Sequence, residues 1–480
     1  MPSTPIDPTD LDATLKVVEL GNRFIRLKPC YRDRPPTALV VVASNACRRE
    51  QNQVRRFAYK KSGGSGVSIR MSTSSNNPNF PKSLLPMISF SQQQSKPFAF
   101  EHLLRGAFEI EHTPRGLLPH RLPSWVMSQS NDDNLAMAES QPSGVYLMFL
   151  TEAMNVELDV LPTRYVYVGA PPRPAGIFDF LIDGHLARQA SATSSNLVTL
   201  DIATGATSRQ AGVPCTLRFH GLPVGRKQIQ IWLPHNETAE LISLRADDLV
   251  EPVTADVRKR WMHHGSSISQ GSNASSPSST WPAVAAALGN VELLNLGFGG
   301  SALLDPFTAR VMRDTPADFI SLKVGINLVN MDLMRMRAFT AALHGFLDTL
   351  RDGHADTPLL VMSPIYCPIH ENTPGPGAFD LGALAEGTVK FRATGKSEER
   401  RAGKLTLDSI RTELHRVVGQ RALQDPNLCY VDGLALYGPS DFAIHPLPDA
   451  LHPDTYSHRL IGERFAELAF GSKGPFTSAP

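Results

Sequence analysis

The second half of this chain alternates short apolar runs with helical segments, and no other feature of the sequence constrains the fold as strongly. The apolar runs lie at 261–265, 291–296, 319–324, 358–363 and 428–432. The helical segments lie at 281–289, 306–313, 331–351, 405–422 and 455–470. Strands that alternate with helices pair in parallel, because each helix carries the chain back across a face of the sheet. The sequence therefore predicts an α/β fold with a doubly wound, five-stranded parallel sheet.

The region between residues 105 and 249 has a different pattern, in which apolar and polar residues alternate with a period of two. That period is typical of strands that bury one face, and turn residues separate the segments. The predicted strands are 144–150, 156–161, 165–168, 177–184, 216–219 and 228–233. Because no segment here has a convincing helical period, we predict an all-β sandwich, jelly-roll-like, over 105–255, followed by the α/β domain over 256–480.

Residues 22–100 are strongly basic, with 14 Lys/Arg and 2 Asp/Glu, although the whole chain holds 47 and 46. One interpretation is an arm that binds nucleic acid or a membrane surface. The other is a disordered insertion without a packed core, and a misassigned gene segment would have the same pattern. A base-stacking surface needs aromatic residues between the charges, and here they are few. We therefore predict a terminal segment over 1–21 and a low-complexity, disordered insertion over 22–104, with no nucleic-acid partner.

The sequence also bears on the compartment. It has no run of roughly 18 apolar residues that would span a membrane, and the N-terminus lacks the basic and apolar regions of a secretory signal. The 5 cysteines are scattered and have no CxxC spacing, which argues against a disulfide framework or a zinc site. We expect a cytoplasmic protein without a membrane partner, and the sequence leaves the oligomeric state open.

Residues suited to catalysis follow four of the predicted strands. Ser267 follows the first strand, Gly300 the second and Asn327 the third. Asp449 and His452 come after the last strand. The carboxyl ends of parallel strands meet at one edge of the sheet, where α/β proteins bind ligands. We therefore expect these residues to converge on one site.

Ser267 and His452 are the predicted centre of a nucleophilic acyl transfer. A serine is a weak nucleophile until an imidazole takes its proton and a carboxylate orients that imidazole. Asp449, three residues before His452, would supply the carboxylate. His452 would then return the proton to the leaving alcohol.

Each of these residues has an alternative interpretation. The loop around Ser267 is rich in serine and would also serve as a simple helix entry. His445 and His458 are alternative bases, although neither has a carboxylate at the same spacing. Asp454 is an alternative to Asp449 for orienting the imidazole.

Three N–H donors are predicted to bind the oxyanion that forms on the substrate carbonyl. They are the backbone N–H of Ser267, the backbone N–H of Gly300 and the side-chain amide of Asn327. Donors already in place supply a large part of the rate enhancement in acyl transfer. The alternatives are a tight turn at Gly300 and a helix N-cap at Asn327.

Two other motifs bear on metal and cofactor binding. His263 and His264 are adjacent on a strand, so they face opposite sides of the sheet and cannot hold one ion together. The Gly-Phe-Gly-Gly segment at 297–300 does not complete a GxGxxG motif, and no acidic residue suited to a ribose follows it. We expect no metal ion and no cofactor.

Four short segments of the α/β region carry a family resemblance. They are Gly-Ser-Ser-Ile-Ser at 265–269, Asn-Leu-Gly-Phe-Gly-Gly at 295–300, Val-Gly-Ile-Asn at 324–327 and Asp-Ala-Leu-His at 449–452. In order and spacing they resemble the four blocks of the SGNH (GDSL-type) hydrolases, over about residues 261–470. The resemblance implies a flavodoxin-like domain, a triad of Ser267, Asp449 and His452, and an oxyanion hole that includes Gly300 and Asn327.

The first of these segments departs from the family pattern at one position. Ser266 stands where the family usually has an aspartate. Because this position is not part of the triad, the departure leaves the mechanism intact and changes only the hydrogen bonding of the loop.

The region before the α/β domain resembles the β-sandwich module that precedes the SGNH domain in some bacterial and fungal esterases, including carbohydrate deacetylases. Residues 177–184, Ile-Phe-Asp-Phe-Leu-Ile-Asp-Gly, carry most of this likeness. It implies a serine esterase for acetyl or other short acyl esters, with a small-molecule or saccharide ester as substrate. The alternatives are a longer-chain lipid or thioester acylhydrolase and a catalytically idle carbohydrate-binding protein.

Overall fold

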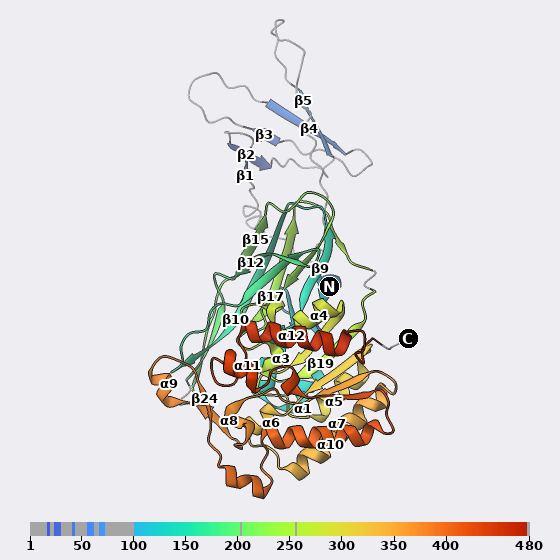
Figure 1. Ribbon diagram of the computed structural model, residues 1–480. Coiled ribbons are helices and arrows are strands. Elements are labelled where there is room, and N and C mark those ends of the chain that lie inside the picture. The colour runs from blue at the N-terminus through green and yellow to red at the C-terminus, as the bar shows by residue number, and fades with distance from the viewer. Residues whose placement is uncertain are drawn as a thin grey trace, which may run out of the picture. The chain divides into compact units, whose positions relative to one another are not determined.

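The computed structural model describes residues 100–477, apart from 202–203 and 255–256, and the backbone of five strands in the preceding part of the chain (Figure 1). Contacts group Met1–Phe98 into one unit and Ala99–Pro480 into another. The strands of the first unit pair antiparallel in chain order and are β1 (Val17–Glu19), β2 (Phe24–Pro29), β3 (Val41–Ala43), β4 (Arg55–Lys61) and β5 (Val67–Ser72). The insertion predicted to be disordered at 22–104 falls largely on residues outside the described ones, so it stays a prediction.

A parallel sheet of five strands forms the centre of the α/β part. Its strands are β19 (Arg260–Gly265), β20 (Glu292–Gly297), β21 (Phe319–Lys323), β22 (Leu359–Met362) and β25 (Leu428–Val431). They lie in the order β20-β19-β21-β22-β25, and every neighbouring pair is parallel. Strand β19 comes first in the chain and lies between β20 and β21, so later strands are added to the sheet in both directions from it. The predicted α/β fold with five parallel strands is confirmed.

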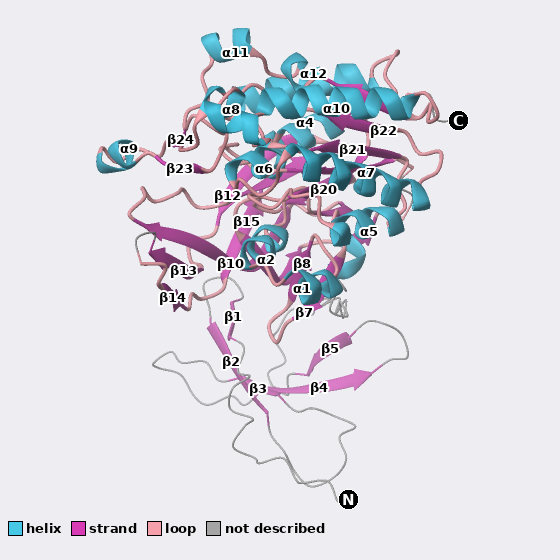
Figure 2. Cartoon of the chain, turned by 90° about the horizontal axis from the view of Figure 1, so that it is seen from below, coloured by secondary structure: helices cyan, strands magenta, loops and turns pink. Residues whose placement is uncertain are grey.

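Helices cover both faces of this sheet (Figures 1 and 2). The long ones are α4 (Trp281–Gly289), α5 (Pro306–Asp314), α7 (Met336–Gly353), α10 (Leu407–Ala422) and α12 (Thr455–Phe470). The short ones are η3 (Pro277–Ser279), α6 (Ile326–Asn330), η5 (Gly433–Ala435) and α11 (Pro439–Ile444). Helices α4 and α12 pack together on one face, and α5, α7 and α10 lie on the other. No helix in the described part of the chain combines the length and hydropathy that a bilayer crossing requires.

One predicted helix begins later than expected. The prediction for 331–351 began at residue 331, whereas α7 begins at Met336. Asp332 has a φ of 50°, in the left-handed region, and this interrupts the helical path between α6 and α7.

Trp261 of β19 holds the strands and helices together beneath the carboxyl edge of the sheet. Its ring stacks on Phe465 of α12 with centroids 4.9 Å apart. Its indole N–H donates a hydrogen bond of 2.8 Å to Ser321 Oγ on the neighbouring strand. A buried tryptophan needs such a partner for its N–H, and this one fixes β19 against β21 and α12.

Two further sheets precede the α/β part. One has the order β14-β13-β10-β17-β8-β7 with β15 beside β10, and the other has the order β12-β11-β16-β9-β18 with β6 beside β9. The first is built from β7 (Glu109–His112), β8 (Leu117–His120), β10 (Asn155–Val168), β13 (Asn196–Asp201), β14 (Thr207–Gln210), β15 (Cys215–His220) and β17 (Thr238–Ala246). The second is built from β6 (Leu104–Arg105), β9 (Tyr146–Thr151), β11 (Ile177–Ile182), β12 (His185–Ser191), β16 (Lys227–Trp232) and β18 (Val250–Pro252), after the short helix η2 (Phe100–Leu103).

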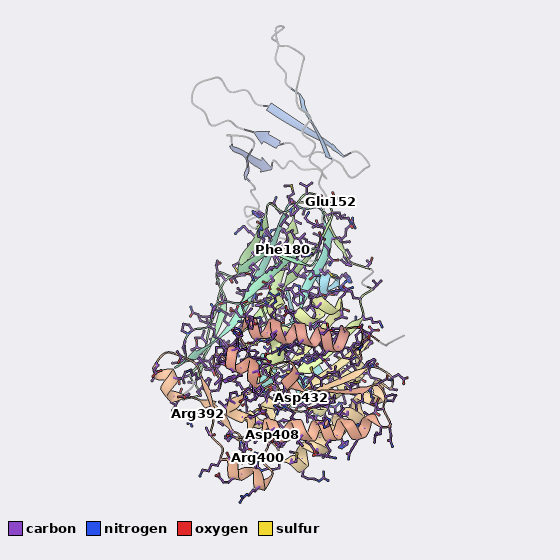
Figure 3. All side chains as sticks on the ribbon, in the orientation of Figure 1. Glu152, Phe180, Arg392, Arg400, Asp408 and Asp432 are labelled. Atoms are coloured by element: carbon purple, nitrogen blue, oxygen red, sulfur yellow. The ribbon has the colours of Figure 1, made fainter. Side chains whose placement is uncertain are left out.

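The two sheets contact each other through aromatic side chains. Phe180 of β11 and Phe219 of β15 stack with ring centroids 4.3 Å apart, and Figure 3 labels Phe180 among these strands. All six strands predicted in this region coincide with strands of the structure, although two of them are parts of one. The sandwich with jelly-roll-like connections stays a prediction.

The strand β10 joins two segments that were predicted as separate strands, 156–161 and 165–168. Pro162, which lacks a backbone N–H, lies between these two segments. On one edge β10 pairs with β15 through Val160 and with β13 from Thr163 onward. Pro162 lies in the gap between these two partners, where the ladder on that edge is interrupted.

The prediction that this region has no helix is wrong. Helices α1 (Ser124–Ser130) and α2 (Asp133–Ser140) lie between β8 and β9. Asn131 between them has a φ of 45°, in the left-handed region, and separates the two helices. Because each helix is short, the sequence has no long segment with a helical period. Asp132 caps α2 by accepting hydrogen bonds from the N–H groups of Asn134 and Leu135, at 2.9 and 3.2 Å.

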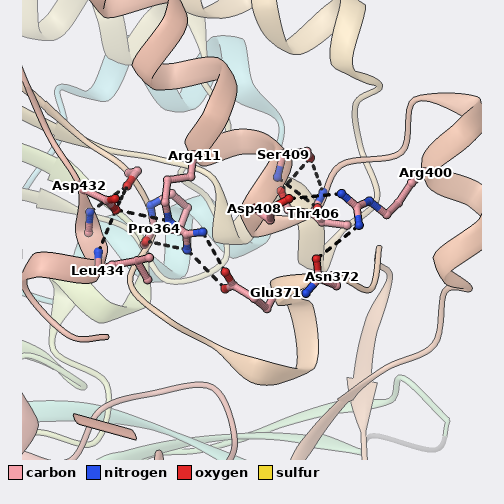
Figure 4. A network of polar contacts seen from close by, with 12 residues as sticks. Pro364, Glu371, Asn372, Arg400, Thr406, Asp408, Ser409, Arg411, Asp432 and Leu434 are labelled. Carbon is pink, nitrogen blue, oxygen red and sulfur yellow. Dashed lines mark hydrogen bonds and ion pairs between the residues drawn. The ribbon is translucent and has the colours of Figure 1, made fainter. Parts of the chain in front are cut away.

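Between β22 and α10 the chain makes an excursion over residues 368–403, which contains several short elements. They are α8 (Pro368–Glu371), β23 (Gly377–Phe379), α9 (Leu381–Ala385), β24 (Phe391–Ala393) and η4 (Ser397–Ala402). Arg411 of α10 donates to Glu371 at 2.8 Å and lies 3.4 Å from Asp432 (Figure 4). Arg400 of η4 bonds Asp408 of α10 at 3.3 Å. These contacts fix both ends of the excursion against α10.

Candidate active site

Ser267, His452 and Asp449 form a continuous chain of hydrogen bonds. Ser267 is the first residue of α3 (Ser267–Gln270), directly after β19, and its Oγ lies 2.9 Å from His452 Nε2. The other ring nitrogen, Nδ1, lies 2.7 Å from Asp449 Oδ2. Residues separated by 185 positions in the chain thus meet at the carboxyl edge of the sheet. The predicted convergence of these three residues is what the structure has.

Asp449 accepts several hydrogen bonds besides that of the imidazole. Its Oδ1 accepts from the backbone N–H groups of Leu451 and His452, at 2.9 and 2.7 Å. The side-chain amide of Asn273 donates to Oδ2 at 3.0 Å. Burial alone would raise the pKa of this carboxyl group, but the hydrogen bonds from His452 and the backbone lower the pKa to about 2. Asp449 is therefore ionised at neutral pH and orients the imidazole.

The alternative partners proposed from the sequence lie elsewhere. His458 is buried and hydrogen-bonds to the backbone of α4 and of the loop after α3. The ring of His445 packs against Tyr456, with centroids 4.0 Å apart. Asp454 caps α12 and does not bond the imidazole of His452. Of the candidate bases, His452 is the one that reaches Ser267.

Local interactions expose Ser267 at the turn between strand and helix. Ser266 is the N-cap of α3, and its side chain accepts from the N–H of Ile268 at 3.4 Å. Serine is a favourable N-cap residue, and so is the aspartate that usually stands at this position in the SGNH hydrolases. The hydroxyl of the next residue, Ser269, lies 2.8 Å from His263 Nε2 beneath the helix. The ends of α3 are therefore held, and Ser267 faces the open side.

His263 and His264 point to opposite faces of the sheet, as adjacent residues of a strand must. His263 lies between the hydroxyls of Ser321 and Ser269, at 2.7 and 2.8 Å. His264 bonds the carbonyl of Leu296 at 2.7 Å. Burial lowers the pKa of His263 well below its usual range and lowers that of His264 to about 4, so both are neutral. The described residues include no cluster of three or more His, Cys, Asp or Glu that could hold a metal ion.

The glycine turn after β20, Gly297–Gly300, borders Ser267. A Cβ placed on Gly299 would lie 3.6 Å from Ser267 Cβ, so the backbone passes directly beside the serine. The N–H of Gly299 donates to Gln270 Oε1 at 2.7 Å and is therefore occupied. Gly300 has a φ of 78°, and none of the described residues accepts a hydrogen bond from its N–H.

Asn327, on α6, is buried at the same edge. Its Oδ1 accepts a hydrogen bond of 3.2 Å from the N–H of Ala302. This contact fixes which way the side-chain amide points and leaves the NH₂ group for another acceptor. Asn327 and Gly300 both line the pocket that contains Ser267 and His452.

That pocket has a volume of about 550 Å³. It is lined by Asn134, Met137, Ala138, Gln141, Arg164, Tyr165, Val166, Tyr167, Pro172, Arg173, Pro174, Leu197, Asn236, Glu237, Ser267, Gln270, Ser272, Gly299, Gly300, Asn327, Asn330, Phe391, Leu451 and His452. More than half of these residues come from the two-sheet part, which contains none of the site residues predicted from the sequence. The paired tyrosines at the end of β10 were visible in the sequence, but a Tyr-Val-Tyr-Val strand gives no sign that it extends over an active site.

The excursion supplies a further wall of the site. Phe391 of β24 packs edge-on against the imidazole of His452, with centroids 5.6 Å apart. Its backbone N–H donates to the carbonyl of Asp449 at 2.9 Å. The excursion thus supports the loop that carries the imidazole and its carboxylate.

A serine in contact with a carboxylate-oriented imidazole, at the carboxyl edge of a doubly wound sheet, defines the site of a serine hydrolase. Residues 258–368 match the family described as GDSL-like lipase/acylhydrolase. Over this range the α/β part is similar to that family, and the match together with the geometry of the site supports a serine esterase of the SGNH type. The matched range contains Ser267, Gly300 and Asn327, whereas Asp449 and His452 lie beyond it.

Solved structures share this architecture over most of the chain. A salicylyl-acyltransferase from a tetracycline biosynthetic pathway is 27% identical, with a TM-score of 0.62, over 75% of this chain and 92% of its own. A protein described as a GDSL-like lipase, from Bacteroides ovatus, is 18% identical, with a TM-score of 0.52, over 76% of this chain and 93% of its own, and shows the fold alone. A family two carbohydrate esterase from Clostridium thermocellum, at 13% identity and a TM-score of 0.44 over 68% of this chain and 91% of its own, carries no argument about substrate. No curated protein matches the sequence.

Proposed function

We propose that the protein hydrolyses carboxylic esters of small molecules through an acyl-enzyme on Ser267. The observation that supports this proposal most directly is the relay in which Ser267 Oγ lies 2.9 Å from His452 Nε2 and His452 Nδ1 lies 2.7 Å from Asp449. These lengths are within the range required for proton transfer between the groups.

In the first half of the reaction Ser267 Oγ bonds to the ester carbonyl carbon while its proton passes to His452 Nε2. The bond between that carbon and the alcohol oxygen then breaks, and His452 gives its proton to the departing alcohol. In the second half water bonds to the acyl carbon, His452 takes a proton from the water, and the carboxylic acid leaves as Ser267 Oγ is reprotonated. Asp449 stays ionised and stabilises the imidazolium in both halves.

The oxyanion of each tetrahedral intermediate would be held by three donors. They are the backbone N–H groups of Ser267 and Gly300 and the side-chain amide of Asn327. The donors of Gly300 and Asn327 are free of partners in the described residues and border the same pocket. Loss of one such donor lowers kcat by roughly 10²–10³-fold in comparable sites.

The pocket supports a substrate with a ring-bearing alcohol and a short acyl group. Its volume of about 550 Å³ is far larger than an acetyl group needs. Tyr165, Tyr167 and Phe391 line it, and aromatic side chains pack well against sugar or aromatic rings. Arg173 lies over the ring of Tyr167, 5.7 Å from its centroid, which adds a positive charge to this wall. We expect acetyl or similar esters, with a saccharide as one class of alcohol.

A second candidate function is acyl transfer to an acceptor alcohol instead of water. It is favoured by the similarity to the salicylyl-acyltransferase, which extends over 75% of this chain. The chemistry differs only in the group that attacks the acyl-enzyme. If benzyl alcohol is added during turnover of p-nitrophenyl acetate, a hydrolase releases mainly acetate, whereas a transferase accumulates benzyl acetate.

The proposal is tested by the hydrolysis of p-nitrophenyl acetate through octanoate. The wild type should cleave the short esters, Ser267→Ala should lose at least roughly 10³-fold in kcat, and Ser266→Ala, which removes only the N-cap, should stay active. Absence of wild-type activity on every ester would contradict the esterase mechanism and favour an idle binding protein. Equal activity in Ser267→Ala would show that Ser267 is not the nucleophile. A preference for octanoate over acetate would instead favour the lipid or thioester acylhydrolase.

A further inference from the structure

The glycine turn beside Ser267 is held by a side chain from the two-sheet part. The side-chain amide of Asn134, on α2, donates to the carbonyl of Gly299 at 2.9 Å and to Ser301 Oγ at 2.7 Å. From the other side, Gln270 accepts the N–H of Gly299 at 2.7 Å. Two side chains on separate elements therefore fix one glycine between them.

The bond to the Gly299 carbonyl determines where the N–H of Gly300 points. The carbonyl of Gly299 and the N–H of Gly300 belong to the same peptide unit, which is planar and trans, so they point in opposite directions. Because Asn134 holds the carbonyl on the α2 side, the N–H is directed away from α2. A peptide between two glycines is otherwise free to adopt other orientations, since glycine has access to both signs of φ.

Arg121 fixes α2 in relation to the same turn. This side chain is fully buried and donates to the carbonyls of Asn295 at 3.0 Å and Gly297 at 2.6 Å, at the end of β20. It also donates to the carbonyl of Ala138 at the end of α2. Burial lowers the pKa of Arg121 to about 9, so the guanidinium keeps its charge at neutral pH.

We propose that Asn134 is a positioning residue of the reaction, which directs the Gly300 N–H toward the oxyanion, and that Arg121 holds the helix that carries Asn134. The inference rests on the proposed function of Ser267 and Gly300 and goes beyond it, because it assigns a part in catalysis to the two-sheet region. That region then contributes to the rate of the chemical step and not only to the wall of the pocket.

The experiment compares two variants of Asn134 with a matched control in the full chain. Asn134→Asp keeps the shape and removes the donor, and Asn134→Ala removes the contact altogether. Asn134 is exposed near the start of α2, so both variants should fold. The control is Gln129→Ala, which removes a hydrogen bond of 2.5 Å between Gln129 of α1 and Arg310 of α5, away from the pocket.

The expected result separates transition-state stabilisation from binding and folding. On p-nitrophenyl acetate, both Asn134 variants should lose 10- to 100-fold in kcat, with KM within about twofold of wild type. Their affinity for phenylboronic acid, which forms a tetrahedral adduct with an active serine, should fall by a similar factor. Gln129→Ala should keep the wild-type kcat and the wild-type affinity for the boronate.

Each other outcome has a distinct meaning. If the wild type is active and the Asn134 variants keep its kcat, the inference is wrong and the proposed function stands. If Gln129→Ala loses as much kcat as they do, the effect comes from general packing and the inference is again wrong. If the wild type has no Ser267-dependent activity, the proposed function fails and the inference fails with it.

Discussion

His452 is one of 15 histidines in the chain, and its neighbours distinguish it from the others. The Asp-x-x-His spacing lets one carboxylate bond both the imidazole and the backbone N–H of His452, at 2.7 Å each. This local pattern is visible in the sequence, which is why the predicted histidine and aspartate are the ones that reach Ser267. Asn273 was not predicted, because nothing in a serine-rich loop indicates that its amide bonds a carboxylate 176 residues away.

Replacing Asp449 by asparagine tests the role of the carboxylate. An asparagine amide would donate to His452 Nδ1, so the proton would remain on Nε2 and the imidazole could not accept the proton of Ser267. We expect kcat to fall by roughly 10³–10⁴-fold with little change in KM. Asn273→Ala, which removes one hydrogen bond of 3.0 Å to Asp449, should cost less than about tenfold in kcat. Full activity in Asp449→Asn, measured by steady-state kinetics, would contradict the relay.

Lys323 is a buried cation next to the site, and it should lower the stability of the folded state. It pairs in register with Gly265, the residue is 3% exposed, and no carboxylate lies within ion-pair distance of it in the described residues. Burial lowers its pKa from 10.5 to about 8. Between these two values the unfolded chain binds the proton and the folded protein does not, so stability rises as pH increases from 8 to 10.5.

The variant Lys323→Met should therefore be more stable than the wild type at pH 7, by on the order of 1–3 kcal/mol. The difference should shrink as pH rises from 8 toward 10.5, because the wild type loses the buried charge. Urea denaturation of both proteins across this range provides the measurement. A difference that is constant with pH, or a less stable variant at pH 7, would contradict a charged Lys323 without a partner. Either result would require a new assignment of the protonation states of the titratable groups nearby, which are His263, His458 and Cys367.

At the scale of elements, the five strands and the glycine turn were predictable and helix α2 was not. A strand buried on both faces leaves a continuous apolar run, and glycine at a strand end is easily recognised. Helix α2 has only 8 residues and a polar composition, and its importance comes from the contact of Asn134 with a turn 165 residues later. Such a contact depends on how two separate parts of the chain pack, which neither period nor spacing encodes.

The glycine turn itself yields a prediction. In Gly300→Ala the new Cβ would lie 2.6 Å from Asn134 Nδ2, and the residue would have to keep a φ of 78°. We expect a loss of about 1–2 kcal/mol in stability from the left-handed backbone and a loss of at least tenfold in kcat from the displaced turn. Gly387→Ala is the control, since that glycine has a φ of 75° and no atom within 4 Å of the added Cβ. It should lose similar stability and keep its kcat; equal kcat in both variants would show that the turn does not act in catalysis.

At the scale of the whole molecule, the predicted boundary between residues 255 and 256 divides one hydrophobic core. Leu122, Val126, Leu135 and Ala138, which precede the boundary, belong to the same buried cluster as Trp261 and the other core residues of the α/β part. The sequence has one region of alternating apolar and polar residues and one region of alternating strands and helices, and it therefore indicated two domains. It could not indicate that α1 and α2, which were not predicted, complete the core of the second.

A shared core predicts that both parts unfold together. All four tryptophans, Trp125, Trp232, Trp261 and Trp281, lie between residues 99 and 480 and report on both parts. Tryptophan fluorescence during urea denaturation should give one transition, and esterase activity should be lost at the same midpoint. Two fluorescence transitions, or activity that outlasts the unfolding of the two-sheet part, would contradict a common core and a contribution of that part to the site.

The central claim is that Ser267, and not a neighbouring serine, attacks the substrate. A fluorophosphonate reacts with a serine only when a base has activated it, so the site of labelling identifies the nucleophile directly. After digestion, mass spectrometry should place the adduct on Ser267, and Ser267→Ala and His452→Ala should remain unlabelled. An adduct on Ser266 or Ser269, or an enzyme that cleaves esters while Ser267 stays unmodified, would contradict the account.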